Sequence, residues 1–286
     1  MPALITPLTE DEQINRPVLT KLVSSLLAQG ADGFYIGGAT GEGIALPQKE
    51  REILAEVTIQ TVDKKKPCIV HVASTDFKQA VALAKHAESC GADAISAIPP
   101  MFYPFDEDDV YLYYKRLAES VHIPLIIYYN PAAGFRVNAE FAARMFEVEN
   151  VTGIKWTSSD YYGMNVLKDL THGEMNVING PDEMLLMGLA AGADGGIGST
   201  YNFMLPTIKR IYESFRAHDL TDAAAAQTEA DRVIRVLLRG KIIPVCKAVL
   251  EAQGFDVGDC VFPLKKYTPS QKKEIVDAMR AAGLKI

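Results

Sequence analysis

Cysteine and histidine are scarce in this 286-residue chain, and neither occurs in a disulfide or metal-binding pattern. The four cysteines show no Cys-x-x-Cys spacing, and the five histidines form no His-Glu-x-x-His cluster. This scarcity argues against a zinc site and against a disulfide framework. We therefore expect reduced thiols, no metal ion and a cytoplasmic location.

Excess positive charge and long apolar runs are also lacking. The net charge of −7 predicts no basic surface for nucleic acid. No apolar segment approaches the roughly 20 residues of a membrane-spanning helix, and residues 1–6 lack the basic and apolar regions of a signal peptide. We expect neither a nucleic-acid partner nor a membrane partner.

The phrase Gly-Ala-Asp occurs three times, beginning at Gly30, Gly91 and Gly192. Each copy follows a segment with helical periodicity and precedes an apolar run. Glycine at this place suits a helix C-cap in the left-handed region, after which the chain enters a buried strand. The repeat therefore predicts alternating helices and strands.

Eight apolar segments are predicted strands, and amphipathic stretches separate them. The segments are 3–6, 33–36, 68–72, 94–98, 125–128, 151–155, 177–179 and 195–198. Eight such repeats most simply close into an α/β fold of the (β/α)8 TIM barrel type. An open doubly wound sheet is the alternative, but no Gly-x-Gly-x-x-Gly follows the first strand.

The last part of the chain has only helical patterns, at 223–238, 242–253 and 270–282. The sequence thus predicts a catalytic barrel over residues 1–220. Residues 221–286 would form a C-terminal helical extension packed on the barrel, as part of one structural unit.

Lys155 ends the apolar segment 151–155, where a lysine is unexpected because strands of a parallel sheet are covered on both faces. Burial disfavours the charged form of an amine, and a neutral amine is a nucleophile toward ketones. Alternatively, the stem packs on the sheet and the ammonium reaches solvent.

Polar residues follow several other predicted strands, at the end where barrel enzymes carry their chemistry. A glycine-rich stretch, 37–41, could bind a carboxylate through backbone N–H groups and Thr40, although such turns are common. Tyr128 could carry protons near an amine, and composition alone favours Tyr129 equally. Asp182 and Glu183 could bind sugar hydroxyls or merely stabilise the start of a helix.

Thr157 and Ser199 add hydroxyls at two further strand ends. A lysine, a phenol and a carboxylate-binding loop together suit Schiff-base chemistry on a 2-keto acid. In that chemistry the covalent imine on Lys155 serves as the electron sink, so no cofactor is required.

The motifs Gly-Gly-x-Thr-Gly-Glu at 37–42, Tyr-x-x-Pro at 128–131 and Gly-x-Lys at 153–155 resemble one family. It is the dihydrodipicolinate synthase and N-acetylneuraminate lyase family of pyruvate-dependent class I aldolases. The resemblance runs from Thr6 through the eighth strand and continues more loosely into the helical tail. Segments 155–160, 179–183 and 192–202 are most similar to the N-acetylneuraminate lyases of this family.

The resemblance implies a homotetramer of barrels in which Lys155 forms the imine and Tyr128, rather than Tyr129, is catalytic. Thr40 and the N–H groups around Ala39 would hold the pyruvate carboxylate. The positions that match sugar-binding residues are Thr157, Gly180, Asp182, Glu183 and Ser199. The implied reaction splits N-acetylneuraminate into N-acetylmannosamine and pyruvate, so the expected partners are a keto sugar acid and pyruvate.

Three departures from the family pattern bear on the choice of function. The synthases carry an arginine shortly after Tyr-x-x-Pro, whereas Arg136 here lies too far along, which argues against a dihydrodipicolinate synthase. Ala39 and Phe102 replace hydroxyl residues of the usual proton relay. The first alternative is an aldolase for another 2-keto-3-deoxy sugar acid. Less favoured alternatives are a dihydrodipicolinate synthase and a non-catalytic barrel that binds keto acids.

Overall fold

The computed structural model describes all 286 residues, and the chain divides into two compact units. One unit combines Met1–Lys66 with Gly198–Ile286, and the other is Pro67–Ile197. We call them the terminal unit and the central unit and describe each by itself. The division predicted at residue 220 stays a prediction.

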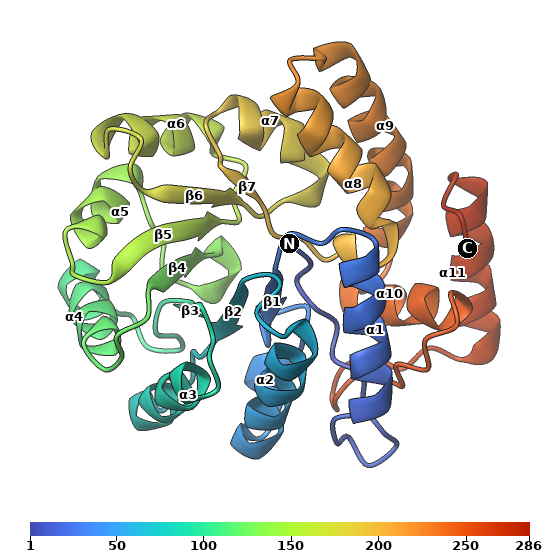
Figure 1. Cartoon of the computed structure of the whole chain (residues 1–286), viewed down its shortest axis with the longest axis horizontal. Coiled ribbons are helices and arrows are strands. Elements are labelled where there is room, and N and C mark those ends of the chain that lie inside the picture. The colour runs from blue at the N-terminus through green and yellow to red at the C-terminus, as the bar shows by residue number, and fades with distance from the viewer. The chain divides into compact units, whose positions relative to one another are not determined.

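The central unit is an alternation of parallel strands and helices (Figure 1). Its strands pair in chain order: β2 (Cys68–His71), β3 (Ala94–Ala97), β4 (Leu125–Tyr129), β5 (Val151–Trp156), β6 (Asn176–Asn179) and β7 (Gly195–Gly196). Its helices are α3 (Phe77–Ser89), α4 (Glu107–Ala118), α5 (Ala139–Phe146), α6 (Tyr161–Leu170) and α7 (Leu185–Ala190), with short 3-10 turns η2 (Pro131–Ala133) and η3 (Asp182–Met184). Helices α3 to α6 lie along the outer side of these strands.

The Gly-Ala-Asp repeats have the predicted conformation. Gly30, Gly91 and Gly192 all have positive φ, between +84° and +107°, and each follows a helix. In two of the repeats the aspartate has a second role, because its carboxylate accepts an N–H at the start of the preceding strand. Asp93 accepts from the Cys68 N–H and Asp194 from the Val177 N–H, each at 2.8 Å. These two repeats therefore each join a helix end to two neighbouring strands, whereas Asp32 of the first repeat pairs with Lys66 and Lys209.

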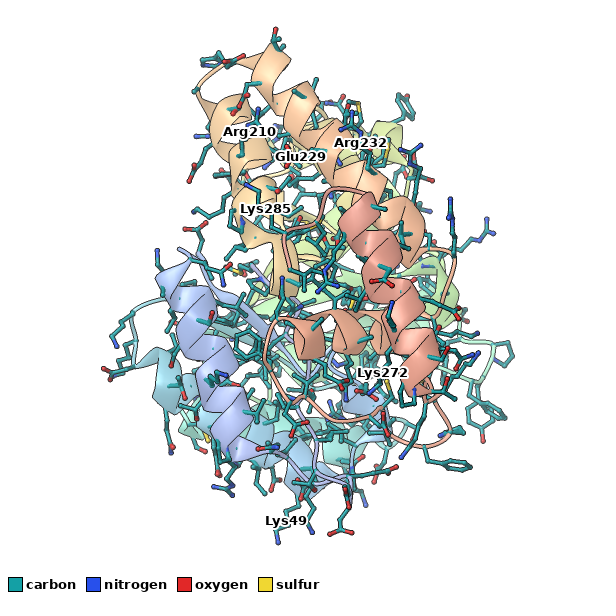
Figure 2. The ribbon with its side chains drawn as sticks, turned by 90° about the vertical axis from the view of Figure 1, so that its right-hand side faces the viewer. Lys49, Arg210, Glu229, Arg232, Lys272 and Lys285 are labelled. Atoms are coloured by element: carbon teal, nitrogen blue, oxygen red, sulfur yellow. The ribbon has the colours of Figure 1, made fainter.

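The terminal unit begins with α1 (Arg16–Ala28), β1 (Phe34–Ile36), the 3-10 turn η1 (Gly43–Ala45) and α2 (Gln48–Val62). It continues with α8 (Tyr201–Arg216), α9 (Leu220–Leu237), α10 (Ile242–Ala252) and α11 (Pro269–Ala281). Helix α8 packs on α9, and α10 contacts α8, α9 and α11. Figure 2 shows Arg210 of α8 beside Glu229 of α9. None of the helices is at once long and apolar enough to span a bilayer.

The first predicted strand, 3–6, is not formed as a strand. Only Pro2 and Ala3 form bridges, to Gly198 and Tyr35 respectively. Beyond them, the buried Asn202 side chain replaces strand pairing: its Oδ1 accepts from the Ile5 N–H at 3.0 Å, and its Nδ2 donates to the Ala3 carbonyl at 2.7 Å. A side chain far along the sequence thus holds this segment, which periodicity could not predict.

Candidate active site

Lys155 and Tyr128 lie directly opposite each other on the paired strands β5 and β4. Partners in register share a face of the sheet, so the two side chains meet. The Lys155 Nζ stands 4.0 Å from the centre of the Tyr128 ring, and Lys155 is only 5 % exposed. The sequence left open whether the amine reaches solvent, and the structure buries it against a phenol ring.

Tyr129 takes a different place, although it is adjacent to Tyr128. It pairs with Trp156, and the two rings meet edge to face with centroids 5.0 Å apart. Because side chains alternate along a strand, Tyr129 points to the face opposite Lys155. Of the two tyrosines, the structure therefore brings only Tyr128 to the lysine.

His71 was missed in the sequence reasoning. It is buried at the end of β2, and its ring meets the Tyr128 ring edge to face at a centroid distance of 5.9 Å. The only sequence feature that could have pointed to His71 is that it is a polar residue within the apolar segment 68–72. This contact helps to fix the orientation of Tyr128.

Thr157 and Gly180 follow β5 and β6 and are in close contact. A Cβ on Gly180 would lie 2.1 Å from the Thr157 Oγ1, so no larger residue fits without displacing the threonine. The Thr157 Oγ1 is buried and has no hydrogen-bond partner within the protein. A buried hydroxyl in this state is suited to bind a polar ligand group.

Asp182 and Glu183 form the first turn of η3, directly after β6. Asp182 is buried, whereas Glu183 is exposed.

Tyr161, at the start of α6, donates a long hydrogen bond of 3.5 Å to the Asn179 Oδ1. Burial and the charge of Glu183 raise the pKa of Tyr161 well above its usual value. The phenol therefore stays protonated and available as a donor.

In the terminal unit, the stretch 37–43 after β1 is a tight loop that glycine makes possible. We call it the glycine loop. A Cβ on Gly43 would stand 1.8 Å from the Gly37 carbonyl oxygen, and Gly37 itself has a φ of +69°. The buried Thr6 hydroxyl donates a hydrogen bond of 2.6 Å to the Gly41 carbonyl and so fixes the loop to the N-terminal segment.

Thr40 and Ser199, both predicted site residues, meet in the terminal unit. Their hydroxyl oxygens lie 2.6 Å apart, which is a short hydrogen bond. Thr40 is buried, and Ala39 beside it is exposed. The contact joins the glycine loop to the segment that follows β7, so the two hydroxyls orient each other.

Phe102 and Tyr103 lie in the exposed segment between β3 and α4. Phe102 is 88 % exposed with a φ of +84°, and the two rings meet edge to face at 5.1 Å. They border a groove of about 560 Å³ whose other lining residues include Met101, Phe105 and Leu112. The segment therefore presents two neighbouring exposed aromatic rings beside a groove.

A comparison with protein families gives a match to the model described as "Dihydrodipicolinate synthetase family", over residues 1–282. The chain belongs to this family. The resemblance inferred from the sequence motifs is thereby confirmed.

Among curated members of the family, the chain is 35 % identical to an N-acetylneuraminate lyase of Rhizobium meliloti over 264 residues. That alignment covers 92 % of this chain and 88 % of the relative.

Solved structures of the family support the same conclusion. The N-acetylneuraminate lyase of Aliivibrio salmonicida is 29 % identical with a TM-score of 0.95, covering all of this chain and 96 % of that one. A Clostridium difficile protein in complex with mannosamine is 30 % identical with a TM-score of 0.94, covering 98 % and 97 %. The predicted fold class is confirmed: this family member is an α/β protein of the (β/α)8 TIM barrel type with a C-terminal helical extension.

Proposed function

We propose that this chain is a class I aldolase, a carbon–carbon lyase that cleaves N-acetylneuraminate to N-acetylmannosamine and pyruvate. The buried contact between Lys155 and Tyr128 carries the proposal, because it pairs an amine with a proton carrier at the ends of adjacent strands. The motifs at 37–42, 128–131 and 153–155 and the lyases among its relatives support the choice of reaction.

The proposed reaction begins when the Lys155 amine attacks the C2 ketone of the open-chain sugar acid. Loss of water from the carbinolamine gives a protonated imine. Tyr128 takes the proton of the C4 hydroxyl, the C3–C4 bond breaks, and its electron pair moves into the imine. N-acetylmannosamine leaves as an aldehyde, and the remaining enamine takes a proton at C3. Hydrolysis then releases pyruvate and restores Lys155, so the proposed chemistry needs no cofactor and no metal.

The binding roles follow the chemistry of the side chains. Thr40 and the backbone N–H groups around Ala39 hold the carboxylate of the substrate. The unpartnered hydroxyl of Thr157 and the hydroxyl of Ser199 bind the polyol, and the substitution-intolerant Gly180 keeps room for it. Asp182 and Glu183 accept hydrogen bonds from the sugar hydroxyls.

Assembly and location are part of the same proposal. We infer a homotetramer in the cytoplasm, and the exposed Phe102 and Tyr103 supply an apolar surface suited to a second copy. In this assembly, water, Thr40 or the substrate carboxylate takes over the proton transfer for which Ala39 and Phe102 offer no hydroxyl.

Borohydride reduction in the presence of N-acetylneuraminate tests the proposal, with peptide mass mapping of the product. A reduced pyruvyl adduct on Lys155 is expected, and it should vanish in Lys155→Ala. If only added pyruvate gives the adduct, the aldolase chemistry stands and the sugar acid is a different one. Ligand-dependent melting without any adduct would identify a non-catalytic binding barrel and contradict the proposal.

A further inference from the structure

The glycine loop ends in a buried ion pair that the proposed reaction does not use. Glu42, the residue after Gly41, has a left-handed conformation with a φ of +58°. Its side chain points inward to Lys247 of helix α10, and the two side chains are 0 % and 3 % exposed. Two opposite charges are thus fully withdrawn from water inside the terminal unit.

Each polar atom of the pair has a defined partner. The Glu42 Oε1 lies 2.8 Å from the Lys247 Nζ and has no other hydrogen-bond partner. The Glu42 Oε2 accepts from the Val261 N–H at 2.7 Å, and the Lys247 Nζ donates to the Asp259 carbonyl at 2.6 Å. The segment after α10 therefore closes around the carboxylate.

The pKa of the neighbouring Cys260 thiol shows that this region is shielded from water. Burial, followed by the charge of Glu42, raises the pKa of Cys260 to about 12. In such surroundings an unpaired charge is strongly unfavourable, so Glu42 and Lys247 each need the other in place. Apolar side chains would fill this space equally well but would not define the position of a loop end so narrowly.

We propose that Lys247 is a positioning residue for substrate binding: through Glu42, it holds the glycine loop in the shape that binds the substrate carboxylate. The inference rests on the proposed function, because it concerns the loop to which that function assigns the carboxylate. Thr6, Ser199 and the Glu42–Lys247 pair hold the loop at three points, through Gly41, Thr40 and Glu42 respectively. The C-terminal helical extension thereby contributes to the binding of a ligand that it need not touch.

The experiment compares two ketones that form the same imine, pyruvate with a carboxylate and acetone without one. Adduct formation on Lys155 is measured by borohydride trapping over a range of ketone concentrations. The variants are Lys247→Met and Glu42→Gln, with Lys266→Met as matched control. Lys266 contacts Asp259 in the same segment but is half exposed.

For Lys247→Met and Glu42→Gln, the pyruvate concentration that gives half-maximal trapping is expected to rise about tenfold or more, as for lost hydrogen bonds to a charged group. Trapping by acetone should be unchanged, and Lys266→Met should behave as wild type. The double variant Glu42→Gln/Lys247→Met leaves no unpaired charge. It should melt at a higher temperature than Lys247→Met while keeping the weakened response to pyruvate.

Other results overturn the inference. The Glu42–Lys247 pair serves only the fold if the variants trap pyruvate as well as wild type does. The same conclusion follows if adduct formation weakens by the same factor with pyruvate and with acetone. The same holds if none of the variants folds. Failure of the proposed function is distinguishable, because the wild-type protein would then form no pyruvate adduct.

Discussion

At the scale of single residues, one position along a strand decides which tyrosine contacts Lys155. Tyr128 and Tyr129 are both buried and both belong to β4. The pleat directs Tyr128 to Lys155 and Tyr129 to Trp156. Composition could not separate the two residues, whereas the register of β4 against β5 does.

This difference gives a matched pair of variants. Tyr128→Phe keeps the ring but removes the hydroxyl, and we expect kcat for cleavage to fall about 10²- to 10⁴-fold, as for loss of a general acid–base group. Tyr129→Phe should keep kcat within about tenfold of wild type, because its hydroxyl is remote from the amine. Steady-state cleavage rates check both. Equal losses in the two variants would contradict the assignment of Tyr128.

The sequence alone predicts which residues belong to the candidate site better than it predicts which of them are in contact. Lys155 is conspicuous because a charge ends an apolar strand, and Thr40 because it lies in a glycine-rich stretch. The fit of Gly180 against Thr157 depends on how β5 and β6 are aligned, which no local pattern records. The Glu42–Lys247 pair joins residues from opposite ends of the chain, and the lysine in α10 is equally consistent with a solvent-directed head.

At the scale of elements, a charged cluster connects helices α8 and α9 (Figure 2). The guanidinium of Arg210 binds both carboxylate oxygens of Asp222, and its Nη1 lies 3.2 Å from the Glu229 Oε2. Hydrogen bonds from Arg210 and Ser214 lower the pKa of Asp222 to about 2. A carboxyl whose pKa is lowered by folding stabilises the folded state above its unfolded pKa of about 4.

Asp222→Asn should therefore lower the melting temperature at pH 7, by no more than about 3 °C because the group is partly exposed. The difference from wild type should shrink as the pH falls from about 4 toward 2, since the wild-type carboxyl then becomes protonated. Thermal melts over this pH range provide the measurement. In an Arg210→Met background the same substitution should have little effect, and a constant difference at every pH would refute the ion-pair explanation.

The elements themselves were predictable because local signals agree. Apolar segments, amphipathic spacing and the Gly-Ala-Asp junctions placed strands β1 to β7 and the C-terminal helices close to their observed bounds. The segment 3–6 is the exception. Its Ile5 N–H binds a side chain 197 residues away, and periodicity contains no information on such a contact.

At the scale of the whole molecule, burial divides the four thiols into two classes. Cys68, Cys246 and Cys260 are buried, and Cys90 is partly exposed. Burial and the charge of Asp93 raise the pKa of Cys68 to about 12, the same value as for Cys260. These thiols are both shielded and protonated at neutral pH, so they are poor nucleophiles.

Iodoacetamide at pH 8 should accordingly label Cys90 first in the native protein, by at least about tenfold in rate over the other three. In urea all four should react at similar rates, which controls for the reagent. Peptide mass mapping over time distinguishes the sites. Early labelling of Cys68 or Cys260 would show that these regions open more readily than the structure indicates.

The proposed tetramer can be tested at the aromatic segment. Phe102→Asp places a charge on the exposed surface and suits the positive φ, so the fold should be kept. Sedimentation velocity should show a mass four times that of the chain for wild type and a smaller species for this variant. Tyr162→Asp, at another ring that is 82 % exposed, should leave the mass unchanged. Identical masses in all three would exclude Phe102 from the interface.

The distance along the chain between Glu42 and its partners has a consequence for synthesis. Val261, which donates to the Glu42 carboxylate, lies 219 residues further on. At about 5–20 residues per second, a ribosome needs roughly 10 to 40 seconds to reach it. During that interval the glycine loop exists without the lysine and the amide that fix its end. The glycine loop is therefore among the last parts of the nascent protein to take its final shape, well after Lys155 and Tyr128 have been made.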